Sequence, residues 1–566
     1  MSFTVIVGAA ASKSQRVLIA HNEDVPGRTV PTQRYVKAQS IVPQALLDVA
    51  GSPQRPEHVF CADVLGMRDR VMSSVYVNDR AVLVFGGAPV SSFCAEEKAS
   101  FSPKNQGIEA ELLQVAAQCV SADEAVRAAG QLLDRYGYSG TGRNFVFADA
   151  RTAWVMSVAR GHCWAARKIA DDEIFMFTDA FAVRTIKLDA PDVLHSPDLP
   201  QWAAHFGVQE VDENGCLDFA LAFQNEKFIN SCVNLARIQQ AFIQLTGLYH
   251  EAPSAQLLQQ KGRAIARCDL QRVLRASSLQ TVQERACGQC DAMHIGAADI
   301  AGSGTRRSWV MRFDDRPLLS LMWMLQGNPE TGVYLPWFVL SGVLPKGYEH
   351  PDESRKAAVG TNSVFAFDLN RSYYIYAMIG ELCNYNRGLV AGILRMQKRY
   401  EQMVPVRVKG VLEEVKTLSD EAAANTLGAF TVAECETMDK VYDSLLTAVD
   451  RRTMAVQAEE LSRSSSDEVE VVLFGSPEFN VQGLDLDSVA WSVGFDTHPK
   501  APLQAARALA VRFEDVDGDG MVDAVLTFSM DDVAKFAPEG VLVDTYLRGL
   551  CHFLRFVAMD PVVFTR

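Results

Sequence analysis

Short runs of alternating apolar and polar residues characterise the first 180 residues of the chain. Residues 4–7 and 16–20 flank a polar turn, which predicts a β-hairpin whose second strand ends at His21-Asn22-Glu23-Asp24. Between residues 108 and 137 apolar positions recur at helical spacing, and Ser121 with Glu124 forms a capping box that predicts the start of a second helix. Four more strand-like runs then predict an antiparallel meander, at 144–148, 153–158, 163–169 and 173–178.

The pattern changes twice toward the C-terminus. Residues 220–460 are mixed and largely helical, whereas 461–468 are polar and serine-rich, which is typical of a linker. Beyond them, short strand candidates separated by turns indicate an all-β region. We therefore predict an α+β body at residues 1–460, a linker at 461–468 and a β-rich domain at 469–566.

Charge and composition exclude several classes of protein. The chain of 566 residues has 54 Lys and Arg against 69 Asp and Glu, a net charge of −15, so it lacks the positive surface that a phosphate-binding nucleic-acid protein needs. No apolar run approaches the ~18 residues of a membrane span.

Twelve cysteines without repeated spacings indicate reduced thiols. The N-terminus lacks a signal-peptide pattern, which predicts a cytoplasmic protein. The oligomeric state is not determined by these features.

Ser2 follows the initiator methionine directly and precedes the first predicted strand. Methionine is usually removed before a small residue, and a serine that starts a chain carries an α-amine able to take the proton of its own hydroxyl. The ordinary pKa of that amine, about 7.7–8.0, leaves a neutral fraction near pH 7. Serine is nevertheless common at this position, so the residue alone is equally compatible with no catalytic role.

The order of motifs along the chain supplies further support. Residues 2–8 and 18–24 resemble the N-terminus of the dipeptidase and secernin family of N-terminal nucleophile hydrolases, which begins with Cys-Thr-Thr and ends its first hairpin with Arg-Asn-Glu-Asp. The resemblance continues through the helix pair and the meander, is dense to about residue 210 and becomes thin toward residue 450. It implies a four-layer αββα sandwich that needs no cofactor for catalysis.

Position by position, the resemblance also implies roles for individual residues. Ser2 would be the nucleophile, its amine the general base, and Asp24 the carboxylate that orients this amine. Asn78, in a turn after the second hairpin, would donate to the oxyanion that forms during acyl transfer. Ordinary turn chemistry is the alternative for both Asp24 and Asn78.

Three positions depart from the family pattern. Ser2 replaces the usual cysteine, which is compatible with an active hydroxyl or with a dead site. His21 stands where the dipeptidases carry arginine, although acyltransferase-like relatives have a pattern similar to His21-Asn22. We expect these two residues to bind substrate or to form hydrogen bonds. Asp179 occupies the place of an asparagine oxyanion donor, so it is protonated, it binds a substrate amine, or the register is shifted by one residue.

A dense group of aspartates lies near the C-terminus, at Asp515, Asp517, Asp519 and Asp523. These are positions one, three, five and nine of a loop whose sixth residue is Gly520, a pattern that suits calcium. Leu526 at position twelve excludes a complete EF-hand. The surrounding residues 468–566 resemble a β module appended to many bacterial proteins, often extracellular ones, so an extracellular location is the alternative to the cytoplasm. A metal-free turn is the alternative to the calcium site.

Together these features predict a hydrolase that cleaves a linear amide or small peptide through an acyl-enzyme on Ser2. Its substrate would be a small amide, a dipeptide or an acyl-amine. The alternatives are a catalytically inactive relative that binds a ligand or mediates attachment, and an acyltransferase that uses the same site.

Overall fold

The computed structural model describes most of the chain, in segments with gaps between them. The described residues are 2–25, 29–43, 46, 55–66, 70–90, 108–205, 211–224, 232–247, 256–258, 264–276, 299–302, 304–350, 371–385, 390–447, 451–457, 460–464, 468–477, 479–493, 505–540, 542–552 and 554–565.

A seven-stranded antiparallel sheet contains the N-terminal hairpin. Its strands, in sheet order, are β14 (Gln256–Leu258), β10 (Glu173–Phe177), β1 (Phe3–Val7), β2 (Leu18–Asp24), β15 (Thr305–Arg312), β16 (Leu321–Gln326) and β17 (Leu335–Trp337). Every residue of β1 and β2 is buried, because the sheet is covered on both faces. The predicted hairpin is therefore confirmed, and it forms the centre of this sheet.

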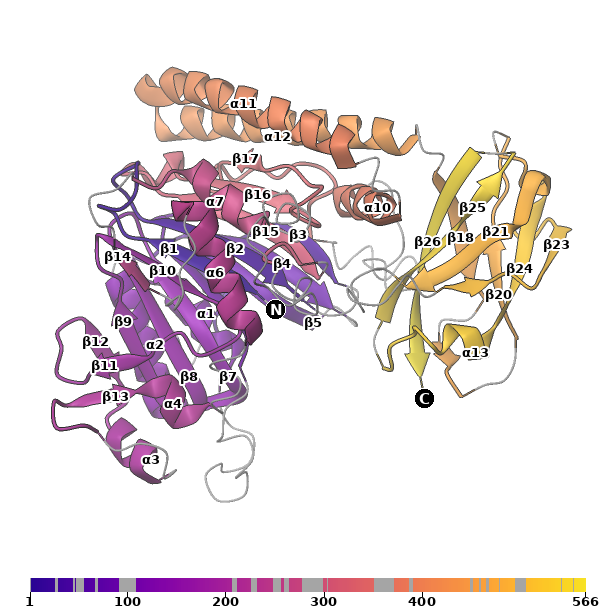
Figure 1. Ribbon diagram of the computed structural model, residues 1–566. Helices are drawn as coiled ribbons and strands as arrows, with labels where there is room; N and C mark the ends of the chain where they lie inside the picture. The colour runs from indigo at the N-terminus through magenta and orange to yellow at the C-terminus, as the bar shows by residue number, and fades with distance from the viewer. Residues whose placement is uncertain are drawn as a thin grey trace.

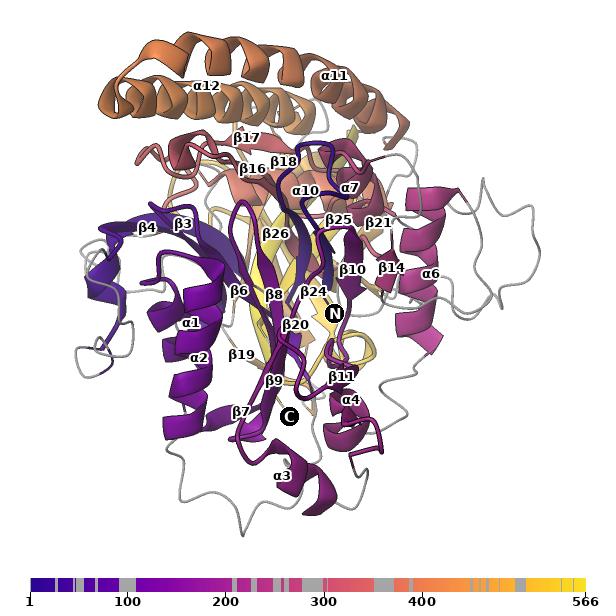
Figure 2. The same ribbon diagram turned by 90° about the vertical axis from the view of Figure 1, so that its left-hand side faces the viewer.

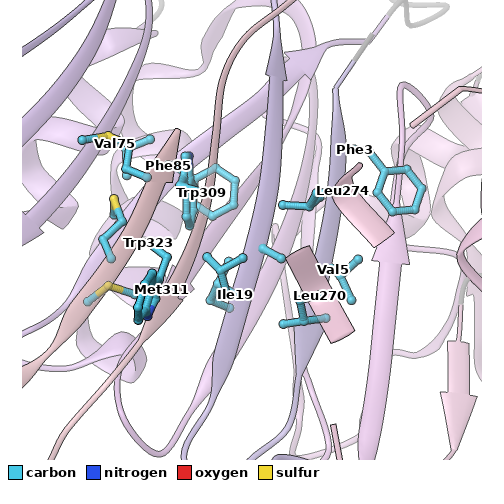
Figure 3. Packing of buried hydrophobic residues seen from close by; sticks show 14 of the residues in the cluster. Phe3, Val5, Ile19, Val75, Phe85, Leu270, Leu274, Trp309, Met311 and Trp323 are labelled. Carbon is cyan, nitrogen blue, oxygen red and sulfur yellow. The ribbon is translucent and has the colours of Figure 1, made fainter. Parts of the chain in front are cut away.

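A second, eight-stranded sheet packs against the first. In sheet order it comprises β12 (Val193–His195), β9 (Trp164–Lys168), β8 (Ala153–Gly161), β7 (Tyr138–Ala148), β6 (Leu83–Pro89), β5 (Arg70–Asn78), β4 (His58–Gly66) and β3 (Val30–Lys37). Alternate residues point to opposite faces: Val75 and Phe85 join the core shared with Val5 and Ile19 of the first sheet (Figure 3), whereas Tyr76 belongs to a separate cluster beneath two helices.

Helices lie on the outer faces of both sheets. The helices α1 (Ala110–Ala116) and α2 (Ala122–Tyr136) lie beside the eight-stranded sheet, and α6 (Cys232–Thr246) lies on the opposite side of the molecule (Figure 2). α7 (Arg267–Leu274) and α12 (Asp420–Thr447) contact the seven-stranded sheet, and α12 runs beside α11 (Val390–Glu414) (Figure 1). The mixed α+β class is confirmed; its assignment to the N-terminal nucleophile fold stays a prediction.

Two details of the predicted body have clear outcomes. Ser121 caps α2, because its side chain accepts the Glu124 N–H at 3.2 Å, so the predicted helix start is confirmed. The Glu124 carboxylate accepts the Val120 N–H at 2.9 Å, so the second bond of the predicted capping box goes to the preceding residue. The predicted four-strand meander is wrong in its last member. β7, β8 and β9 pair in succession, but β10 crosses to the other sheet and pairs with β1. Strand alternation alone cannot distinguish these two partners, because it predicts a strand and not its neighbour in a sheet.

The smaller elements complete the body. α3 (Leu199–His205) and α4 (Phe219–Phe223) accompany a two-stranded sheet of β11 (Thr185–Lys187) and β13 (Cys216–Asp218), and α10 (Ser372–Tyr385) precedes the long helix pair. Among the described residues, no helix combines the length and the apolar character needed to cross a membrane.

The C-terminal part forms a nine-stranded sheet around its own apolar cluster, which includes Trp491. Its strands are β18 (Arg451–Val456), β19 (Glu460–Ser462), β20 (Glu468–Leu473), β21 (Leu484–Val493), β22 (Ala506–Arg507), β23 (Ala510–Glu514), β24 (Asp523–Ser529), β25 (Leu542–Cys551) and β26 (Leu554–Thr565), with the short helix α13 (Met530–Val533) after β24.

This sheet starts earlier in the sequence than the predicted boundary. β18 precedes the predicted linker of 461–468, and β19 extends into it. Both strands pair in parallel with β26, close to the C-terminus, so their place in the sheet depends on a partner about a hundred residues away. The structure therefore moves the start of the C-terminal sheet to Arg451, directly after the end of α12 at Thr447.

Candidate active site

Ser2 lies where the ends of three strands meet. It precedes β1, and the antiparallel register pairs Phe3 with Asn22, so the end of β2 runs alongside it. The backbone N–H of Asp24 donates to Ser2 Oγ at 3.4 Å. On the other side of β1, strand β10 ends at Phe177, and two residues later Asp179 Oδ1 accepts the Ser2 N–H at 2.9 Å. The structure thus brings together Ser2, Asp24 and Asp179, three of the predicted site residues.

Arg237 completes this group and was not predicted from the sequence. It extends from α6 and is only 3% exposed. Its guanidinium lies 3.7 Å from Asp24 Oδ2 and 4.0 Å from Asp179 Oδ2. The sequence could have indicated it, because Arg237 is the single charged residue between positions 232 and 246. A lone charge in such an apolar and neutral segment usually has a specific partner inside the protein.

The two aspartates differ in their surroundings. Asp24 Oδ1 also accepts the Thr305 hydroxyl at 2.5 Å, from β15 on the other side of β2. Asp179 Oδ2 is buried and has no hydrogen-bond partner among the described residues. Burial raises the pKa of Asp179 above its ordinary value and the Asp24 charge adds to this, while the N-terminal amino group, Arg237 and the Ser2 N–H oppose the shift.

His21 belongs to the apolar core behind the site rather than to an open pocket. It is 1% exposed, with its ring 4.8 Å from that of Phe85 and 5.5 Å from that of Trp309. Its Nδ1 lies 2.9 Å from Thr4 Oγ1. Burial above all, then the charge of Arg307 and weaker charges, lowers the pKa of His21 to about 3, so its imidazole is neutral at pH 7. Of the two predicted roles, the structure places His21 as a hydrogen-bonding residue.

Asn22 likewise forms structural hydrogen bonds. Its Nδ2 donates to the carbonyl oxygens of Leu274 and Ile300, both at 2.8 Å. These bonds attach the end of α7 and the segment at residue 300 to β2. Because both amide hydrogens are used, Asn22 has none left to donate to a substrate.

Asn78 requires a correction. It is fully buried at the end of β5, where its Nδ2 donates to Ala117 O at 3.0 Å and to Cys119 O at 2.7 Å. Its Oδ1 accepts the backbone N–H groups of Arg80 and Val82, both at 3.0 Å. A primary amide has two hydrogens, and both are used here. Asn78 therefore joins a hairpin turn to the segment after α1, and the predicted oxyanion role is wrong for this arrangement.

A buried ion pair, which the sequence did not reveal, lies beside the site. Glu23 follows Asn22 in β2 and pairs with Arg307 of β15, and both side chains are buried. Arg307 also donates to the carbonyl oxygens of Ala62 at 2.8 Å and Asp63 at 3.2 Å in the second sheet. The pair therefore helps to link the two sheets next to Asp24, at the end of β2.

The aspartate loop brings three of its four predicted ligands together. Oxygens of Asp515, Asp517 and Asp523 lie within 4.8 Å of one another, while Asp519 is outside this group. Oxygen ligands at this spacing suit a hard cation such as calcium. Both oxygens of Asp523, however, already accept backbone N–H groups, from Gly475 at 2.8 Å and Val516 at 2.9 Å. The donor set is compatible with a calcium site, which stays a prediction.

Comparison with known proteins relates this chain to peptidases. Residues 65–367, more than half of the chain, match the sequence family described as Peptidase family C69. Probable dipeptidase B of Lactococcus lactis subsp. lactis (strain IL1403) is 26% identical over 218 residues, which cover 35% of this chain and 43% of that protein. A probable dipeptidase of Latilactobacillus sakei is 32% identical over 72 residues, 13% of this chain and 15% of that protein. The chain thus matches less than half the length of either relative.

Proposed function

Because the chain belongs to peptidase family C69, we propose that it hydrolyses small peptides or linear amides through an acyl-enzyme on Ser2. One observation carries this proposal. Both the nitrogen and the hydroxyl of Ser2 are contacted by the acidic residues at neighbouring strand ends, Asp24 and Asp179, with Arg237 between their carboxylates.

The proposed reaction uses the α-amine that is freed when Met1 is removed. The neutral amine takes the proton of the Ser2 hydroxyl while Oγ attacks the substrate carbonyl carbon. The amine then gives this proton to the leaving nitrogen as the amide C–N bond breaks, which leaves an ester on Ser2. Water, deprotonated by the same amine, attacks the ester, and Oγ recovers a proton as the acid product leaves.

The contacts of Asp24 would support these steps. Asp24 keeps Ser2 in place through its backbone N–H, and its carboxylate is held in turn by Thr305 and Arg237. Such prior positioning lowers the entropic cost of the attack. We propose a dipeptide or a similarly short amide as the substrate, since both relatives are named probable dipeptidases.

The test begins with the mature N-terminus. Intact mass should show a chain that starts at Ser2 with a free amine, and a serine-reactive acylating probe should label Ser2 in the wild type. Ser2→Ala should abolish both labelling and dipeptide hydrolysis. Ser40→Ala removes an exposed serine hydroxyl shortly after β3 and should change neither the labelling of Ser2 nor the hydrolysis. Retention of Met1 or acetylation of Ser2 would refute the proposal and favour an inactive ligand-binding protein. Full activity in Ser2→Ala would refute Ser2 as the nucleophile of an active enzyme.

A further inference from the structure

Asp179 contacts the Ser2 nitrogen at the position where the family resemblance implied the neutral side chain of an asparagine. Its Oδ1 accepts the Ser2 N–H at 2.9 Å, and an ionised carboxylate cannot donate to an oxyanion. It is well suited, however, to a positively charged α-ammonium. We propose that Asp179 is a positioning residue that binds the protonated α-amine of Ser2 as its counter-ion, so that the amine keeps its proton to higher pH than an ordinary N-terminal amine. This inference rests on the proposed function for the free amine of Ser2.

The charges around the amine support this role. Asp24 and Asp179 contribute two negative charges, and Arg237 contributes one positive charge close to both. Within this group, a protonated amine adds a second positive charge close to the two carboxylates, which a neutral amine does not. Burying an uncompensated charge is unfavourable, so the surroundings favour the ammonium.

Among the described residues, the other titratable groups near the N-terminus do not reverse this balance. His21 is neutral at pH 7, because its pKa lies at about 3. The charge of Arg307 is compensated by its ion pair with Glu23. Arg143, on β7, acts on His21 from a distance and donates to Gly87 O at 2.6 Å.

Asp179 is the better of the two aspartates for an experiment. Asp24 also binds the Thr305 hydroxyl, and its backbone contacts Ser2 Oγ, so its replacement would disturb several interactions. In contrast, the Asp179 carboxylate contacts the Ser2 nitrogen through one oxygen and lies near Arg237 through the other. Asparagine keeps an oxygen that can accept the Ser2 N–H but removes the charge. Asp179→Asn therefore tests the charge itself.

The expected effect follows from electrostatics. A charge of opposite sign within ~4–6 Å shifts a pKa by about 1–3 units toward the charged form. The wild-type amine should therefore titrate above its ordinary range of about 7.7–8.0. Because only the neutral amine can act as base, hydrolysis should rise with pH through the same midpoint. Asp179→Asn should lower this midpoint by about one unit or more, which means roughly tenfold more neutral amine at pH 7.

The amine can be titrated without reference to catalysis. The native protein is treated briefly with the N-hydroxysuccinimide ester of acetic acid at a series of pH values, and acetylation of the N-terminal peptide is measured by mass spectrometry. Asp179→Asn should show the lower midpoint, and Asp179→Glu, which keeps the charge, should stay near the wild type. Asp172→Asn removes an exposed carboxylate just before the other end of β10 and should change nothing.

The outcomes separate the two proposals. An unchanged midpoint in Asp179→Asn overturns the counter-ion role, whatever the activity of the enzyme. A lowered midpoint in a protein that hydrolyses no peptide supports the counter-ion role and refutes the hydrolase. If Asp179→Asn does not fold, Asp179→Ser supplies the same comparison with a neutral side chain. Where hydrolysis is detected, the pH profile of kcat/KM should shift by the same amount as the amine titration.

Discussion

Replacing Asn78 distinguishes a structural role from the catalytic one that the sequence indicated. Asn78→Ala removes four hydrogen bonds, two donated to the carbonyls of Ala117 and Cys119 and two accepted from the N–H groups of Arg80 and Val82. A buried hydrogen bond contributes about 1 kcal/mol net. The Arg80 N–H is partly exposed and can bind water instead, so we expect a loss of about 3 kcal/mol in the free energy of unfolding.

The assay compares stability with activity in the same samples. Urea unfolding should show the loss in Asn78→Ala, while Asn214→Ala, in an exposed turn, should stay within about 0.5 kcal/mol of the wild type. In the folded fraction, dipeptide kcat, or the rate of Ser2 acylation, should change by no more than a few-fold. Loss of an oxyanion donor would instead cost about 10²–10³ in kcat. Normal stability with a hundredfold fall in kcat would refute the structural role.

Three further predictions concern stability. The pKa of His21 is about 3 in the folded protein against an ordinary 6.5, so the free energy of unfolding should be highest above pH 6.5 and should fall by about 1.4 kcal/mol per pH unit below it. Between pH 7 and pH 5 the wild type should lose about 2 kcal/mol more than His21→Asn. Equal losses in the two proteins would contradict this prediction. Glu23→Gln leaves Arg307 buried without its partner and should cost about 3–5 kcal/mol in urea unfolding; a loss below about 1 kcal/mol would show that the pair is dispensable. Calcium should raise the melting temperature in proportion to the logarithm of its concentration, and Asp517→Ala should remove the effect; no shift in the wild type would exclude the site.

Local patterns predicted the parts of the fold that depend on neighbouring residues. The hairpin of β1 and β2 followed from strand alternation on either side of a polar segment, and the start of α2 followed from the N-cap residue Ser121. The position of Asp24 beside Ser2 follows from the same hairpin, because antiparallel pairing places the start of β1 next to the end of β2. These interactions span few residues, so the sequence pattern specifies them.

Such local patterns did not predict the contacts between segments that are far apart in the sequence. Strand alternation is the same whether β10 pairs with β9 or with β1, and only the second pairing brings Asp179 to the Ser2 nitrogen. Likewise, an asparagine in a turn fits either a catalytic or a structural role, and the carbonyl groups that Asn78 binds come from the segment after α1, about forty residues later.

The sequence by itself therefore determined a serine at position 2 before a strand, Asp24 at the end of the next strand, an acidic composition and a β-rich C-terminal region. The tertiary structure alone decided which other side chains surround Ser2. It placed Arg237 between two carboxylates, Asp179 on the nitrogen, and Asn22 and Asn78 in structural hydrogen bonds. The physical reason is that the partner of a buried polar group is chosen by the packing of whole sheets and helices, which brings together residues far apart in sequence.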